Sequence, residues 1–172
     1  MGTIDDFEAE LSRIIERCGS SRIAILGIGN ELKGDDAVGL VVIDHLAEAI
    51  DNPLILILNC QNVPENFSAT VKRFRPSCVL LIDAADFGSV PGSVRAFELE
   101  DLENVTTTTH KASLAVMGKY LCSETDANVV VIGIQPADCG FGIGLSATVQ
   151  DASAAVGDTI RTVLNRFGTK ER

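Results

Sequence analysis

Side chains that can bind a cation or move a proton stand where expected strands, helices and loops meet. Asp35 and Asp36 follow a glycine-rich loop, Asp83 ends an apolar run, and His110 follows four threonines. Carboxylate and imidazole groups suit a labile divalent metal ion, and either can also act as a general base. Asp36, Asp83 and His110 are therefore the candidate metal-binding and catalytic residues.

Each of these residues also has a purely structural interpretation. Aspartate is a good helix N-cap, and for an isolated aspartate at position 35 or 36 capping is the more common role. Asp83 could belong to an ordinary turn after a strand, and His110 could cap the helix that follows it. The residue types alone leave both interpretations open.

The glycine-rich loop before these aspartates differs from phosphate-binding loops. A dinucleotide fingerprint needs glycine at position 32, which is Leu32. Gly29 and Gly34 have the spacing of a P-loop, but Asp35 and Asp36 stand where that motif has lysine and a hydroxyl residue. Two carboxylates repel phosphate and attract cations, so a nucleotide-binding domain is disfavoured.

The other histidine and most cysteines favour structural roles. His45 lies on the inner stripe of an expected helix, as a hydrogen-bonded structural histidine would. Cys60, Cys78 and Cys122 adjoin apolar segments, which is typical of core thiols. Cys139 lies in an expected loop, where its thiol could bind a soft metal. The cysteine count is odd and there is no C-x-x-C, which argues against a disulfide framework and fits a reducing cytoplasm.

Composition limits the class of protein. The length of 172 residues predicts one domain over 1–172, with an extra helix within 1–20, and 46% hydrophobic residues can fill its core. A net charge of -10, from 14 basic and 24 acidic residues, argues against nucleic acid as a partner. The apolar runs are far shorter than the roughly 20 residues of a membrane span, so we expect no membrane insertion and a cytoplasmic location.

Hydrophobic periodicity predicts strands alternating with helices. Buried strands are expected at 22–28, 54–59, 79–82 and 129–134, an antiparallel edge strand at 94–99, and helices at about 4–18, 36–50, 65–74, 112–122 and through 149–167. This order predicts a three-layer α/β/α sandwich around a mostly parallel, twisted sheet of about five strands. Such sheets bind ligands outside the carboxyl ends of their strands, which is where Asp36, Asp83 and His110 are expected to converge.

Four motifs occur in an order that resembles one family. They are G-x-G-N-x-L-x-G-D-D, I-D-A-x-D, T-T-H-x-x-x-L and G-I-Q-P, and together they resemble the [NiFe]-hydrogenase maturation endopeptidases, especially the hydrogenase 3 maturation branch. The similarity covers about residues 22–167 and leaves the N-terminal helix outside. Ala37 replaces a glycine of the family motif, and Lys111 and Ala112 depart from the residues that usually follow the histidine.

The resemblance implies an aspartyl-type endopeptidase that removes a short C-terminal extension from a [NiFe]-hydrogenase large-subunit precursor once nickel is inserted. It places metal contacts at Asp36, Asp83 and His110 and adds substrate-binding positions, which are Asn30, Gly34 and Gln135. We expect the nickel to arrive in the precursor, with no resident organic cofactor. The alternative is a non-catalytic, chaperone-like metal-binding module that recognises the large subunit.

Overall fold

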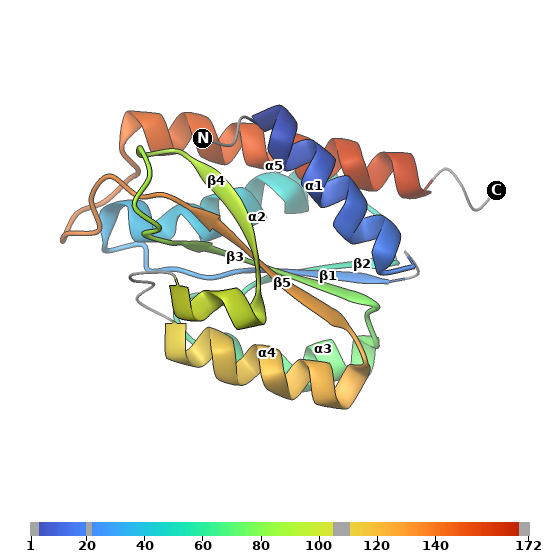
Figure 1. Ribbon diagram of the computed structural model, residues 1–172. Helices are drawn as coiled ribbons and strands as arrows, with labels where there is room; N and C mark the ends of the chain where they lie inside the picture. Colours follow the sequence, from blue (N-terminus) through green and yellow to red (C-terminus); the bar gives the residue numbers. More distant parts are fainter. Residues whose placement is uncertain (1–3, 20–21, 105–110, 169–172) are drawn as a thin grey trace.

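Strands and helices alternate along most of the chain, and only the third and fourth strands follow one another without a helix between them (Figure 1). The computed structural model describes residues 4–19, 22–104 and 111–168. The strands are β1 (Ile23–Gly27), β2 (Ile55–Asn59), β3 (Cys78–Ala84), β4 (Val94–Glu98) and β5 (Asn128–Ile134). The α-helices are α1 (Ile4–Arg17), α2 (Val38–Ala49), α3 (Ser68–Phe74), α4 (Lys111–Thr125) and α5 (Ala147–Gly168). Short 3-10 turns cover Gly34–Ala37, Pro64–Phe67 and Leu99–Asn104.

The strands form one five-stranded sheet in the order β2-β1-β3-β5-β4. The first four strands of that order run parallel, and β4 pairs antiparallel with β5 at the edge. β1, β3 and nearly all of β5 are buried, as expected for strands covered on both faces. The predicted α/β fold, with its mostly parallel sheet and antiparallel edge strand, is confirmed.

Helices cover both faces of the sheet, and each face has its own apolar core (Figure 1). Helices α1, α2 and α5 lie on one face, and α3 and α4 lie on the other. Side chains alternate between the two cores along each strand: Ile23 and Ile25 of β1 join the first core, and Ala24 and Leu26 join the second. No helix in the described part is both long enough and apolar enough to span a membrane.

The N-terminal helix is part of the packed structure. Its buried residues Phe7, Leu11, Ile14 and Ile15 belong to the same core as α2 and α5. Two ion pairs hold its exposed side, Glu8 with Arg166 at 2.6 Å and Arg17 with Glu98. Helix α1 therefore adds to the core on the face that α2 and α5 cover.

Two element boundaries near the predicted site differ from the sequence prediction. The helix expected from residue 36 begins at Val38 and is preceded by the 3-10 turn Gly34–Ala37. The strand expected at 79–82 extends to Ala84, so Asp83 lies within β3 rather than after it. Both differences change how an aspartate is held.

Candidate active site

The order in which strands are added to the sheet reverses between β1 and β3, and the carboxyl ends of these two strands mark that point. From β1 the chain passes through α2 to β2 on one side, while β3 pairs with β1 on the other side. Open α/β sheets bind ligands in the crevice at such a point. Asp36 follows β1 and Asp83 lies near the end of β3, so both are at this end of the sheet.

Both aspartates are buried, with exposed fractions of 1% for Asp36 and 0% for Asp83. Asp83 Oδ1 accepts a hydrogen bond from the Ala84 N–H at 2.9 Å. Burying a carboxylate is costly, and aspartate is rarely buried unless it is paired, hydrogen-bonded or bound to a metal. Because Asp83 is part of a buried strand, its interpretation as an ordinary turn residue is wrong.

Asp36 does not cap helix α2. The N-cap residue of α2 is Ala37 and that of the preceding 3-10 turn is Lys33, and neither position has a side-chain capping bond. Asp36 instead lies inside the 3-10 turn with its side chain buried. The capping interpretation of Asp36 is therefore wrong.

Gly29 allows this turn to pack against the end of β1. The Asn30 N–H donates to the Asp36 carbonyl oxygen at 3.3 Å, which brings the loop and the turn together. A Cβ atom on Gly29 would lie 2.0 Å from that same oxygen. Glycine at this position is thus required by the close approach that sets the position of Asp36.

Asp35 has a different role, because its carboxylate binds the loop of residues 136–146 between β5 and α5. The donors are the N–H groups of Ala137 (2.8 Å), Asp138 (3.0 Å) and Ser146 (2.6 Å), together with the Ser146 hydroxyl (2.9 Å). These partners follow Asp35 by 102 to 111 residues. Asp35 therefore joins the 3-10 turn to the loop on the opposite side of the site.

The hydrogen bonds keep Asp35 ionised. Burial alone would raise the pKa of its carboxyl, but the N–H donors of Asp138, Ser146 and Ala137 outweigh burial and lower the pKa below its ordinary 3.8. At neutral pH this carboxylate is a fixed negative charge beside the site.

A pocket of about 260 Å³ opens next to Asp36. It is lined by Asp36, Ala84, Asp86, Gln135, Pro136, Ala137, Asp138 and Cys139. Three of these residues are aspartates, and Asp83 precedes the lining residue Ala84. The pocket is therefore suited to a cation or to a group that carries one.

The Cys139 thiol in this pocket stays protonated at neutral pH. Burial raises its pKa to about 11, and the negative charges of Asp36, Asp35, Asp83 and Asp138 add to the effect. A thiolate nucleophile would need the opposite environment, with a lowered pKa. Asp36 and Asp138 line the same pocket as Cys139.

Gln135 fixes the wall of the pocket. Its Oε1 atom accepts hydrogen bonds from the N–H groups of Phe87 (3.0 Å) and Ser89 (3.2 Å), and its Nε2 donates to Asp86 Oδ1 at 3.1 Å. The bond from Gln135, with one from the Gly88 N–H, lowers the pKa of Asp86. Gln135 thus ties the end of β5 to the loop that follows β3.

A sequence model of the HycI hydrogenase maturation proteases matches residues 40–163, which is more than half of the chain. The chain belongs to the hydrogenase maturation protease family. It is 31% identical over 133 residues to the hydrogenase 3 maturation protease of Escherichia coli strain K12, covering 77% of this chain and 84% of that protein. The relatives are proteases and endopeptidases, so the chain is a peptide-bond hydrolase and not a non-catalytic module.

Solved structures of this protease family have the same fold. The crystal structure of the [NiFe] hydrogenase maturation protease HycI from Thermococcus kodakarensis KOD1 superposes with a TM-score of 0.82 and 30% identity, over 91% of this chain and 99% of that chain. The solution structure of the endopeptidase HycI from Escherichia coli gives a TM-score of 0.72 with 28% identity, over 80% of this chain and 87% of that one.

Two further residues predicted for this protease, Asn30 and Gly34, shape the loop before the 3-10 turn. Asn30 Oδ1 accepts the Leu32 N–H at 3.0 Å. Gly34 has a φ of +50°, and a Cβ on it would lie 2.7 Å from the Asp138 carbonyl oxygen. Their role in substrate binding stays a prediction.

His110 lies outside the described residues, so its position relative to Asp36 and Asp83 stays a prediction. Within 4–19, 22–104 and 111–168, no three His, Cys, Asp or Glu side chains form a group that could hold a metal ion. His45, the other histidine, contacts Asp158 of α5, with Nε2 and Oδ1 3.3 Å apart. The prediction of a hydrogen-bonded structural role for His45 is confirmed.

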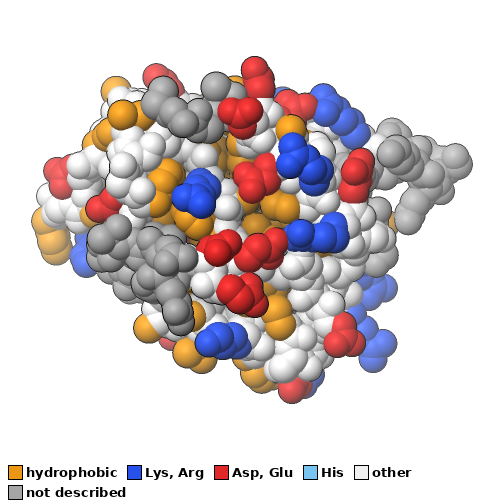
Figure 2. Space-filling view, in the orientation of Figure 1, with side chains coloured by type: hydrophobic (Ala, Val, Ile, Leu, Met, Phe, Trp, Pro, Cys, Tyr) orange, Lys and Arg blue, Asp and Glu red, His pale blue; other side chains and the backbone are white. Residues whose placement is uncertain are grey.

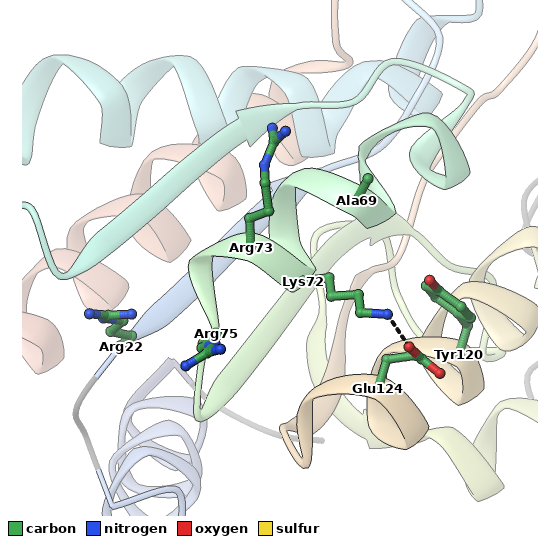
Figure 3. A pocket seen from close by; sticks show the side chains of 7 residues that line it. All are labelled: Arg22, Ala69, Lys72, Arg73, Arg75, Tyr120 and Glu124. Carbon is green, nitrogen blue, oxygen red and sulfur yellow. Dashed lines mark hydrogen bonds and ion pairs between the residues drawn. The ribbon is translucent and has the colours of Figure 1, made fainter.

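A larger concavity of about 820 Å³ lies at the opposite end of the sheet (Figure 3). Arg22 directly precedes β1, and Arg75 lies between α3 and β3, so both are at the amino ends of these strands. Figure 3 shows Lys72 reaching across to Glu124, with which it forms an ion pair. The concavity has more cationic than anionic side chains, whereas the aspartate pocket is lined by carboxylates. Its greater volume therefore does not make the concavity the catalytic site.

Proposed function

We propose that this protease removes the C-terminal extension of a [NiFe]-hydrogenase large-subunit precursor after nickel has been inserted. The observation that carries the proposal is the burial of Asp36 and Asp83 at one end of the sheet, beside a pocket with an aspartate-rich lining. Buried carboxylates beside an open pocket are suited to contact a cation that the substrate brings with it.

Nickel enters this proposal as part of the substrate. Asp36 and Asp83 supply oxygen ligands, and His110 would supply an imidazole nitrogen, a set that suits a labile divalent ion. Asp35, Asp86 and Asp138 add negative charge around the pocket, which favours a precursor that carries the metal over one that lacks it. The metal thus acts as the recognition element that docks the neighbouring peptide bond.

Cleavage needs a water molecule and a base. In the proposed reaction the carboxylate of Asp36 or Asp83 takes a proton from a water molecule while the oxygen of that water attacks the scissile carbonyl carbon. The carboxyl then gives this proton to the amine of the extension, which leaves as the C–N bond breaks. Polarisation of the water by the substrate's nickel is the other route to the same attack. Cys139 is not the nucleophile, because its thiol is protonated at neutral pH.

The test compares nickel-loaded with nickel-free precursor, with product masses measured by mass spectrometry. We expect the wild type to cut only the nickel-loaded form. Asp151→Asn is the control for substitutions of the buried aspartates, since Asp151 is an exposed carboxylate on α5. This variant should cut like the wild type. Equal cleavage of both precursors would refute nickel recognition, and cleavage of neither would refute the proposed substrate.

A further inference from the structure

Two large apolar side chains project from the loop between β5 and α5. Phe141 and Ile143 are each 91% exposed, and Leu32 beside them is 53% exposed. Figure 1 shows this loop, in orange, projecting at the left end of the molecule, and Figure 2 shows apolar side chains at that end. We call Leu32, Phe141 and Ile143 the apolar tip.

Backbone hydrogen bonds order the two segments that carry the apolar tip. The Gly142 N–H donates to the Leu32 carbonyl at 3.0 Å, and the Gly142 carbonyl accepts from the Gly34 N–H at 2.9 Å. These bonds join the two segments that carry the tip, and Asp35 binds both ends of the 136–146 loop. Exposed apolar side chains on such an ordered support mark an interaction surface.

The tip is continuous with the pocket. Asp138 and Cys139 line the pocket, and Phe141 follows two residues later in the same loop. Residues 139–147 carry no charged side chain, whereas the pocket beside them is rich in aspartate. A ligand that covers both surfaces must therefore combine a cationic part with an adjacent apolar part.

We propose that the apolar tip docks an apolar segment of the protein substrate that lies next to the part held in the aspartate pocket. This inference rests on the proposed function, since the occupant is the precursor itself. A few side chains buried at the centre of an interface contribute most of the binding energy, and a pre-ordered loop loses little entropy on binding. The tip thus adds affinity for the polypeptide, while the aspartates select the metal-bearing state.

The experiment replaces both tip side chains, as Phe141→Ser with Ile143→Ser. Binding of fluorescently labelled, nickel-loaded precursor is titrated in the Asp36→Asn background, in which we expect the precursor to stay intact. The control in that background is Val116→Ser, because Val116 is 71% exposed on the outer side of α4 and is not part of the pocket lining. We expect Kd to rise by about tenfold or more for the tip variant and by less than about twofold for the control.

Three outcomes separate this inference from the proposed function. Equal Kd values for the tip variant and its parent would overturn the inference, whether or not the wild type cuts the precursor. Tip-dependent binding without cleavage by the wild type would refute the proposed function and leave the inference standing. A self-associated wild type that the tip substitutions disperse, with precursor Kd unchanged, would make a second copy the occupant and also overturn the inference.

Discussion

Removing the Asp35 carboxylate should destabilise the protein strongly, although Asp35 is not among the predicted metal contacts. The carboxylate accepts three N–H bonds and one hydroxyl bond from the 136–146 loop. Hydrogen bonds to a charged group contribute about 1.5–3 kcal/mol each, and they are not additive when one carboxylate accepts them all. Since pocket water can reach some of the donors, we expect Asp35→Ala to lower the free energy of unfolding by about 3–5 kcal/mol.

Two further variants keep this prediction testable, because so large a loss can approach the whole stability of a domain. Asp35→Asn retains one acceptor oxygen and should lose about 2 kcal/mol. Asp138→Ala is the control, because its exposed side chain accepts the Gly140 N–H at 2.7 Å, and its loss should cost less than about 1 kcal/mol. Urea unfolding at pH 7 measures all three, and a loss below about 1 kcal/mol for Asp35→Ala would refute the reasoning.

The stabilisation by Asp35 should also depend on pH. Its pKa is lowered by folding, so its contribution is complete above the ordinary value of 3.8 and is lost as pH falls through the lower pKa of the folded state. The difference in urea midpoint between wild type and Asp35→Asn should therefore be constant from pH 7 to pH 5 and should narrow below that ordinary value. A difference that grows on acidification would contradict the assigned sign.

Other substitutions and labels test the rest of the site. Asp36→Asn should reduce processing of nickel-loaded precursor by about 100-fold or more with an unchanged circular dichroism spectrum, and unchanged processing would remove Asp36 from the site. Gly29→Ala should cost about 2–4 kcal/mol in urea unfolding, because its Cβ would lie 2.0 Å from the Asp36 carbonyl oxygen. Gly142→Ala is the control: its φ is not positive and its Cβ would meet open space, so it should cost about 1 kcal/mol or less. Iodoacetamide at pH 7.5 should label Cys18 well before Cys139. The pKa of Cys18 is lowered to about 7, chiefly by a hydrogen bond with the Cys78 thiol, whereas burial raises the pKa of Cys139 to about 11. If mass spectrometry showed the opposite order of labelling, the assigned surroundings of both thiols would be contradicted.

The sequence predicts the architecture because each buried strand carries its own signal. The continuously apolar runs of β1, β3 and β5 indicate strands covered on both faces, and the alternation in β4 indicates an edge. The order of strands in the sheet does not follow from such local patterns, since it depends on crossovers that join distant segments. Sequence reasoning also missed the 3-10 turn Gly34–Ala37, because a tight turn before a helix and the first turn of that helix have the same polarity pattern.

The site could be located from the sequence more easily than its parts could be assigned. Asp36 follows β1, and Asp83 lies near the carboxyl end of β3. These parallel strands end on the same side of the sheet, so strand direction is enough to bring the two aspartates together. The function of Asp35 could not be inferred, because its partners lie 102 to 111 residues further along the chain. Gln135 belongs to a motif that the sequence did reveal, but its bonds to Phe87 and Ser89 depend on the pairing of β3 with β5.

The two adjacent aspartates act on the pocket in different ways. Asp36 is part of the pocket lining, whereas the Asp35 carboxylate binds the 136–146 loop, which lines the pocket and carries Phe141 and Ile143 of the apolar tip. The pKa of Asp35 is lowered, so its carboxylate also places a permanent negative charge next to the pocket. This charge contributes to the raised pKa of Cys139. The same hydrogen bonds that order the 136–146 loop therefore strengthen the attraction of the pocket for a cation, so loop order and charge at the site depend on one side chain.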